Sequence, residues 1–449
     1  MSPPTTGSLR GAPAELAVRG FPGPLDTYVA SPPDTGGAVG PNHVVTMLNS
    51  QVMIQSRSGD VRPDYPVPLE QFWSGLGPFD KVFDPRILYD PLAGRWIASA
   101  GVNPASSAAG LLLAVSETGD PAGAWSLIEI QTGKDGCWPD YPVLALNGNW
   151  IVLSANLFTL PPGAYSRTSL YVFDKSDLYR QHNSSYTVFN DYQGTLTPAV
   201  DAAADSATLY FVQAFSSVNG GRIRISALEG AAAGEVFIGG SSEIPIDQPW
   251  AGAAPYDADF APQSGTWLKI DAGDSRLQNC VFRNAAIWCV HTVFLPAEAP
   301  TRSSLEWFAV DPAAGKLQQR GRIDDPAGTA FYAYPSIAVN RNDDVMVGYS
   351  HFTAGDYPSA GFSYRLAADP AGAVRPGIIA KAGEAPYVGP DADSGTNRWG
   401  DFSATMVDPV DDLTFWTVQE YAAFPTDHYP GRWATWWTQA ALPAIRLRK

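Results

Sequence analysis

The stretch that decides the fold is YPSIAVNRNDDVMVGYSH, residues 334–351. Residues 335–340 alternate apolar and polar side chains, which is the pattern of a strand with one buried face. Residues 341–344 form a turn rich in Asn and Asp, which tolerate tight backbone angles. Residues 345–350 are a second apolar strand, which ends at His351. The stretch therefore predicts a β-hairpin. One such unit cannot bury its own apolar faces, whereas a ring of them can.

The same hairpin pattern occurs seven times along the chain. The copies begin at Asp34, Asp84, Tyr141, Thr197, Asn279, Tyr334 and Asp401, and their second strands end at Asn49, Asn103, Asn156, Gln213, His291, His351 and Glu420. Successive starts are spaced slightly more widely than the ~40–50 residues of a four-stranded propeller blade. Asp-Pro-Ala turns followed by glycine recur in the second halves of the units, within 111–125, 305–317 and 362–374. The repeat predicts an all-β fold: a single seven-bladed β-propeller with four-stranded antiparallel blades. Two β-sandwiches in tandem are the alternative.

The propeller is expected to span residues 25–440, between an N-terminal extension, 1–24, and a C-terminal tail, 441–449. The widest spacing between units predicts an insertion at about 230–276. Residues 16–29 are expected to pair with the last blade and close the ring, because closure removes an exposed strand edge.

The three cysteines do not indicate whether the protein is in an oxidising or a reducing compartment. Cys280 and Cys289 are expected to lie opposite each other across a hairpin. Either a disulfide or two buried thiols would fit this position. Cys137 has no evident partner.

Composition excludes some partners. The net charge of −16 argues against nucleic acid or an anionic membrane surface, which need a basic face. No apolar run reaches the ~18–20 residues needed to span a bilayer, so no membrane insertion is expected. Residues 1–20 lack a signal-peptide pattern, which leaves two readings: a cytoplasmic protein, or a mature part without its leader. We expect a monomer.

The ends of the predicted hairpins form the candidate site. The start of each first strand and the end of each second strand lie on one face of a propeller, so the fourteen polar or Tyr residues named above form one rim. His291, His351 and Glu420 fall on consecutive blades, and three interpretations stay open. They bind a transition metal, they transfer protons near neutral pH, or they are ordinary rim residues that hydrogen-bond water. If they converge, the carboxylate should raise the pKa of the histidines.

Aromatic and charged residues flank two of the blade starts. Trp138 and Trp399 are candidates for stacking on a sugar, and Arg398 could hold a carboxylate with two hydrogen bonds. Tyr334 and Tyr141 are expected to assist His291, His351 and Glu420 in catalysis. The expected substrate-binding set is Asp34, Asp84, Asn103, Trp138, Asp140, Asn156, Gln213, Asn279, Arg398, Trp399 and Asp401. The acidic turns 391–393 and 408–412 are candidates for calcium but lack EF-hand spacing. The cofactor is unknown, with calcium and a transition metal both considered.

Several motifs together resemble a known group of proteins. PPDTGGAVGPNHVV (32–45), LYDPLAGRW (88–96), NRWGDFSATMVDP (397–409) and FWTVQEY (415–421) are similar to large bacterial proteins with a seven-bladed propeller of uncertain function. That group is mostly extracellular, so the resemblance implies a secreted or cell-surface protein. The chain is also loosely similar to sialidase-type propellers, whose Asp-box turn has a stretched counterpart in Ser116, Asp120, Gly123 and Trp125. The sialidase arginine triad and Tyr/Glu pair have no counterpart that we can place.

These observations favour a carbohydrate-active enzyme, a glycoside hydrolase or polysaccharide lyase, with its site at the rim and a glycan or small molecule as ligand. The alternatives are a non-catalytic propeller for glycan or protein recognition, and a metalloenzyme using His291, His351 and Glu420.

Overall fold

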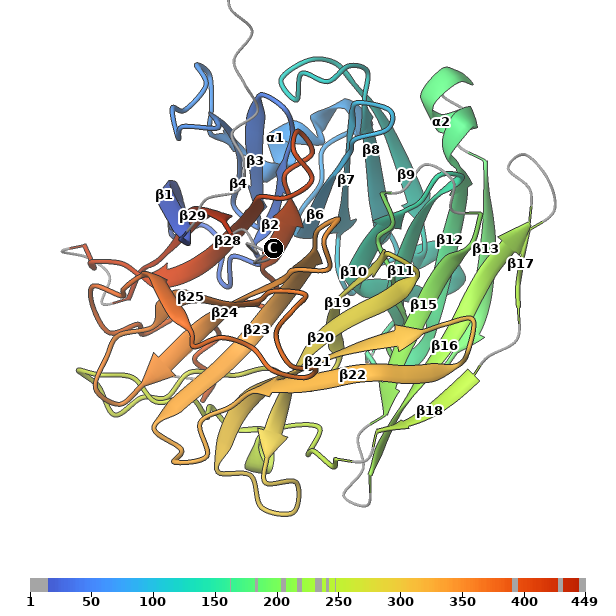
Figure 1. Cartoon of the computed structure of the whole chain (residues 1–449). Helices are drawn as coiled ribbons and strands as arrows, with labels where there is room; N and C mark the ends of the chain where they lie inside the picture. The colour runs from blue at the N-terminus through green and yellow to red at the C-terminus, as the bar shows by residue number, and fades with distance from the viewer. Residues whose placement is uncertain are drawn as a thin grey trace, which may run out of the picture.

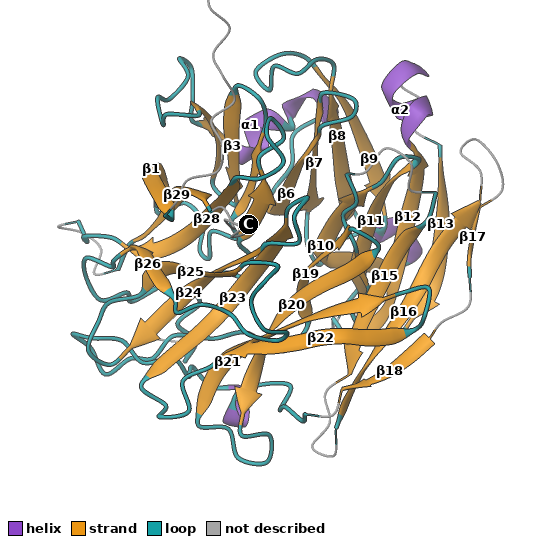
Figure 2. Ribbon diagram, in the orientation of Figure 1, coloured by secondary structure: helices purple, strands orange, loops and turns teal. Residues whose placement is uncertain are grey.

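The computed structural model describes residues 15–443 except 162, 182–184, 203–206, 216–219, 231–235, 240–241, 247, 390–394 and 427–430. Its strands form seven antiparallel sheets around a central axis, which confirms the predicted seven-bladed β-propeller (Figure 1). Helices are few and short in the described part of the chain (Figure 2). None of them is long and apolar enough to cross a membrane.

Each blade runs from an inner strand at the axis to an outer strand at the periphery. Blade one consists of β2 (Gly36–Val39), β3 (His43–Leu48), β4 (Gln51–Ser56) and β5 (Val67–Pro68). Blade two consists of β6 (Val82–Asp90), β7 (Arg95–Val102), β8 (Gly110–Ser116) and β9 (Trp125–Gln131). Blade three consists of β10 (Cys137–Leu146), β11 (Trp150–Thr159), β12 (Tyr165–Asp174) and β13 (Tyr186–Tyr192).

The remaining blades follow the same order. Blade four consists of β14 (Thr197–Pro198), β15 (Leu209–Phe215), β16 (Gly221–Gly230) and β17 (Val236–Ile238), with β18 (Ser242–Ile246) also paired to β16. Blade five consists of β19 (Leu277–Arg283), β20 (Ala286–Leu295), β21 (Arg302–Asp311) and β22 (Lys316–Ile323). Blade six consists of β23 (Ala330–Val339), β24 (Val345–Thr353), β25 (Ser359–Arg365) and β26 (Ile378–Lys381). Blade seven consists of β27 (Ala404–Val407), β28 (Phe415–Ala422), β29 (Trp433–Ala441) and β1 (Ala17–Leu25). The helices are α1 (Leu69–Phe72) and α2 (Lys175–Gln181), with short 3₁₀ turns at Ser74–Leu76, Gly133–Asp135 and Pro255–Asp257.

The N-terminal strand closes the ring. β1 pairs antiparallel with β29, with Phe21 opposite Trp437, so the first and last strands of the chain share one sheet. The expected pairing of residues 16–29 with the last blade is confirmed, so residues 17–24 belong to blade seven rather than to an N-terminal extension. The closure covers the outer edge of β29, which would otherwise present unpaired backbone groups.

Fully buried tryptophans fill the spaces between the sheets, among them Trp96, Trp150, Trp307, Trp416 and Trp437. Trp416 packs at 6.2 Å from Phe21 of β1, measured between ring centroids, and its Nε1 donates to Asp408. The strand that closes the ring is thus held by side-chain packing as well as by backbone hydrogen bonds.

Cys280 and Cys289 face each other across β19 and β20, as the hairpin spacing predicts. All three cysteines are buried and free, so the pair consists of two thiols.

A segment before blade five lies across the rim. Residues 248–276 form one isolated backbone bridge to β20, between Ala251 and Phe294, and two bridges within the segment. Gln263 donates to the carbonyl of Tyr387, and the backbone N–H of Asp271 donates to the carbonyl of Asn397. Residues 248–276, which we call the strap, are thus the last part of the predicted insertion. The strap places its own charged residues at the channel mouth.

Gly20→Val is expected to destabilise the protein by about 1–3 kcal/mol, because overpacking a fitted site forces its neighbours to move. A Cβ at Gly20 would lie 2.6 Å from the carbonyl oxygen of Trp437 and would meet the indole of Trp436. Urea unfolding measures the change. Val18→Thr on the same strand is the matched control, because Val18 is 44% exposed. Equal stability of the two variants would show that β1 contributes little to ring closure.

Candidate functional site

Four of the predicted blade starts have a left-handed backbone conformation; Asp34 precedes β2, whereas the other three lie inside β6, β10 and β23. The φ angles are 50° at Asp34, 51° at Asp84, 52° at Tyr141 and 54° at Tyr334. This conformation is uncommon outside glycine, and strained residues of this kind concentrate at functional sites. The strand register shifts beside three of the four, within β6, β10 and β23. The shifts re-aim the side chains at the start of each inner strand.

Buried side chains at these starts join one blade to the next. Asp34 accepts from the backbone N–H of Asp401 at 2.8 Å and from Asn49 Nδ2 at 2.7 Å. Asn49 Oδ1 accepts from the N–H of Asp84 at 2.7 Å. Asp84 accepts from the N–H of Tyr141 at 3.1 Å. The chain of bonds links blades seven, one, two and three.

A set of charged side chains lies at the channel mouth and is partly exposed. Arg398 Nη2 donates to Asp401 Oδ2 at 3.0 Å, and its Nε lies 3.7 Å from Asp271 Oδ2. Arg276 makes a bidentate pair with Asp274. The side chains of Arg398 and Asp401 are 35% and 31% exposed, so a ligand in solution can reach them. Arg398 and Asp401 were predicted from the sequence, whereas the residues that the strap supplies were not. The acidic run IDAGDSR (270–276) directly before the fifth inner strand was the available signal.

The carboxyl groups at the mouth have unequal tendencies to ionise. Burial and the charge of Asp401 raise the pKa of Asp34 to about 6. Burial raises the pKa of Asp84 well above its usual range, and Asp34 and Asp140 raise it further. Burial also raises the pKa of Asp140, although the nearby Arg276 opposes this effect. Crowded carboxyl groups in a partly dehydrated site therefore retain protons at higher pH than free ones do.

Two aromatic rings lie between two guanidinium groups in the channel beneath the mouth. The guanidinium of Arg276 lies 4.4 Å from the ring centroid of Tyr141, whose ring is 4.7 Å from that of Phe402. On the other side, the guanidinium of Arg86 lies 3.2 Å from the centroid of Phe402. Cation–π contacts of this kind stabilise positive charge on both faces of the aromatic pair. We call these four residues the plug.

The structure does not bring His291, His351 and Glu420 together. The imidazole of His291 is fully buried, with Nδ1 bonded to the carbonyl of Ser275 and the ring against Trp250. His351 packs against Tyr332 instead. No hydrogen bond or ion pair within the described residues joins any two of the three.

The pKa directions also differ from the expectation for a convergent triad. Burial lowers the pKa of His291 and of His351. Burial raises the pKa of Glu420 well above its usual range, and its Oε1 accepts from the Thr35 hydroxyl at 2.7 Å while Oε2 has no partner. The imidazoles thus favour the neutral form. The expected rise in their pKa is wrong because solvent exclusion, rather than a neighbouring carboxylate, dominates.

The metal hypothesis has no support in the described part of the chain, where no group of three or more His, Cys, Asp or Glu side chains is placed to hold an ion. The calcium candidates in turn 408–412 are engaged with arginines: Asp408 pairs with Arg57, and Asp412 pairs with Arg283. The turn 391–393 lies outside the described residues.

The two predicted stacking tryptophans pack against the protein. Trp399 is fully buried, contacts Phe352 and Tyr387, and donates from Nε1 to Ser350. It is therefore a packing residue and not a platform for a sugar. Trp138 is half-buried between Phe83 and Phe158.

The tyrosines at the rim are buried phenols. Burial raises the pKa of both Tyr141 and Tyr334, so each keeps its proton near neutral pH. The Tyr334 hydroxyl donates to the carbonyl of Asp271 and thereby fixes the strap. The Tyr141 hydroxyl has no partner of regular geometry.

The amide side chains at the rim mainly hold loops and neighbouring strands. Asn103 accepts from the N–H of Asp80, Asn156 donates to Thr195, and Gln213 donates to the carbonyls of Gln193 and Gly194. Asn279 Oδ1 accepts from the N–H of Ile337 in blade six. These contacts are the ones expected of structural joints.

No family model and no curated protein matches the sequence. Among solved structures the chain is similar to a protein of unknown function from Dyadobacter fermentans, with 9% identity and a TM-score of 0.42 over 79% of this chain and 93% of that chain. It is also similar to an apocarotenoid oxygenase from Synechocystis, with 12% identity and a TM-score of 0.39 over 75% and 70% of the chains. An exo-β-1,3-galactanase from Phanerochaete chrysosporium has 11% identity and a TM-score of 0.34 over 77% and 80%. At these values the likenesses carry no argument about the activity of this chain.

Glu420→Gln is expected to flatten the dependence of stability on pH. The folded-state pKa of Glu420 lies above the unfolded value of about 4.3. The contribution of this carboxyl group to the stability of the fold is therefore complete below that pH and is lost as the pH rises through the folded-state pKa. The melting temperature of the wild type should therefore fall more steeply than that of the variant as the pH rises above the unfolded-state pKa of about 4.3.

Glu306→Gln is the matched control. The buried Glu306 pairs with Arg322, so this variant should melt at a lower temperature near neutral pH. If both variants lose stability equally and keep the wild-type slope, the Glu420 carboxyl is not held neutral.

Proposed function

We propose that the protein is a carbohydrate-active hydrolase that cleaves neutral glycosides at the channel mouth. The observation that carries the proposal is the pairing of two reachable carboxyl groups in different environments. Asp140 is half-buried with a raised pKa, and Asp401 is held by Arg398 at the mouth. Glycoside hydrolysis uses such a pair, with one carboxyl as the acid and the other as base or nucleophile.

Each residue receives a role from its surroundings. Asp140 donates a proton to the leaving glycosidic oxygen, because burial favours its protonated form. Asp401 acts as the carboxylate on the opposite side of the bond, oriented by the guanidinium of Arg398. Asp140 and Asp401 lie close enough to interact electrostatically. Retention or inversion at the anomeric carbon reports whether Asp401 attacks the sugar directly or activates a water.

The charge balance at the mouth favours a neutral substrate. Carboxyl groups outnumber guanidinium groups there: Asp34, Asp84, Asp140, Asp271, Asp274, Asp401 and Glu420 against Arg276 and Arg398. The two exposed guanidinium groups, Arg276 and Arg398, already pair with aspartates. A uronate or sulfated sugar would be repelled, whereas sugar hydroxyls can donate to the carboxylates.

Asp140→Asn and Asp401→Asn are each expected to lower turnover of a neutral oligosaccharide about 10²–10⁴-fold, the usual contribution of a general acid or base. Product analysis after incubation with neutral and acidic polysaccharides measures the effect. Wild-type activity should decline as the pH rises through the pKa of Asp140, because the acid must hold its proton. Asp60→Asn is the control, because Asp60 is an exposed carboxylate in a turn of blade one beyond the opposite end of β4. Full turnover by Asp140→Asn would refute the assigned acid.

A non-catalytic recognition role is the second candidate. It is favoured by the engagement of both Asp34 oxygens and one Asp84 oxygen in hydrogen bonds within and between blades, which explains part of the polar rim without chemistry. Glycan binding that saturates, weakens in Asp401→Asn and gives no product would support this candidate over the hydrolase.

A further inference from the structure

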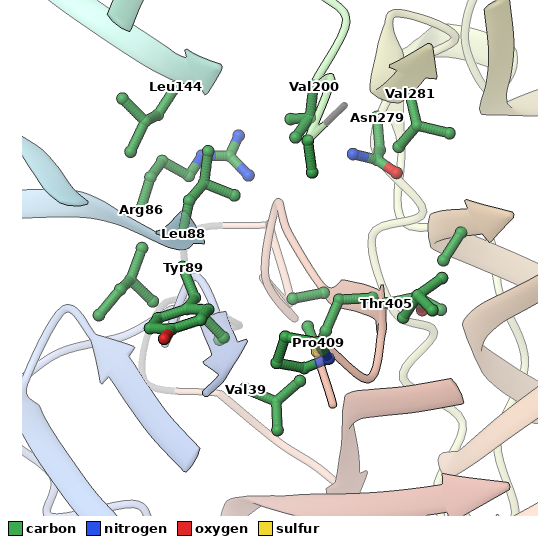
Figure 3. Close-up of a pocket in the computed structure, with 18 of the residues that line it drawn as sticks. Val39, Arg86, Leu88, Tyr89, Leu144, Val200, Asn279, Val281, Thr405 and Pro409 are labelled. Carbon is green, nitrogen blue, oxygen red and sulfur yellow. The ribbon is translucent and has the colours of Figure 1, made fainter. Parts of the chain in front are cut away.

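The channel of the propeller contains a cavity that is separate from the mouth. Its volume is about 380 Å³, and it is lined by the inner strands or adjoining residues of all seven blades. It extends from Arg86 to turns at Pro91 and Pro409, which lie at the opposite end of the inner strands from the rim (Figure 3). Most of the wall is apolar and includes Val39, Leu144, Val200, Val281, Val339 and Val407.

The plug divides the cavity from the channel mouth. Phe402 and Tyr141 are each 3% exposed and lie between the guanidinium groups of Arg276 and Arg86. Arg276 belongs to the mouth, whereas Arg86 lines the cavity. A molecule in the cavity therefore meets the guanidinium of Arg86 at the inner end. The second guanidinium in the lining, that of Arg283, is paired with Asp412.

The cation at this end lacks a close counter-ion. Arg86 Nε donates to the carbonyl of Pro142 at 2.9 Å, and its Nη2 is buried without a hydrogen-bond partner. Within the described residues, no carboxylate lies within ion-pairing distance of Arg86. Burial lowers its pKa, as expected for a cation removed from water. A buried charge is costly unless it is paired.

A second donor faces the same space from another blade. Asn279 Oδ1 accepts from the N–H of Ile337, and Nδ2 has no acceptor among the residues that the structure describes. Figure 3 shows Asn279 across the cavity from Arg86, with its amide nitrogen turned toward the interior. Two donors from blades two and five thus converge on one end of an apolar cavity.

We propose that this cavity binds a small molecule with a carboxylate head and an apolar body. The carboxylate would accept charge-assisted hydrogen bonds from Arg86 and a further bond from Asn279, and the apolar body would lie along the valines toward Pro409. The cavity volume falls within the range of small-molecule sites, about 300–1,000 Å³. This site is independent of the activity proposed for the mouth.

The test compares two ligands of equal length, octanoate and octan-1-ol, by isothermal titration calorimetry. Wild-type protein is expected to bind octanoate at least tenfold more tightly than the alcohol. Arg86→Gln should remove this preference, and Val200→Trp should abolish binding of both ligands by filling the tube. Arg62→Gln is the control, because Arg62 forms a surface pair with Asp120 and should leave the preference unchanged. Equal affinities for the two ligands in wild type, or a preference that survives Arg86→Gln, would overturn the proposal.

A second measurement uses only the wild-type protein. Crystals of the wild type grown with 8-bromo-octanoate should show anomalous bromine signal between the valines and Pro409, with the carboxylate at Arg86. Bromine signal at the rim only, or none in the channel at saturating ligand, would refute the site.

Discussion

The rest of the structure depends on the hydrogen bonds that run from the start of one inner strand to the backbone of the next blade. At Asp34 and Asp84 a buried carboxyl oxygen accepts the N–H of the residue that begins a neighbouring blade. Each of these carboxyls sits on a left-handed backbone that only a few residue types tolerate. Burying them is unfavourable unless their oxygens are satisfied, so the bonds that fix the blades also make the burial tolerable.

These joints place the residues of the candidate site. Asp140 directly precedes Tyr141, whose N–H is held by Asp84, and Arg398 lies three residues before Asp401, whose N–H is held by Asp34. The side chains at the mouth are therefore positioned by backbone bonds between blades rather than by mobile loops. The strap adds Asp271 and Arg276 to the same place, fixed by the Tyr334 hydroxyl. A site built in this way can hold like charges close together, because the fold prevents them from moving apart.

The sequence alone predicts the ring of seven blades but not the directions in which the side chains at the rim point. Alternating strands and repeated turns predict the seven blades, the closure by residues 16–29 and the opposed Cys280 and Cys289, because these features depend on local periodicity. The identity of the site depends on which face each strand end presents, and a shift of one residue reverses that face. His291 illustrates the difference: it was expected to end a strand, yet β20 continues to Leu295 and the ring of His291 turns inward against Trp250. The strap residues were missed because no hairpin pattern connects residues 248–276 to the rim.

The plug gives the two ends of the channel different chemistry and also couples them. Arg86 is the charge that faces the cavity, and the same charge lowers the pKa of Asp84 at the mouth. An anion bound to Arg86 would cancel part of that effect and would favour the protonated form of Asp84 further. By linkage, ionisation of Asp84 must then weaken binding of the anion by the same free energy. The two ends of the channel can thus influence each other, since Arg86 and Asp84 lie two residues apart on β6 and interact through their charges without any movement of the backbone.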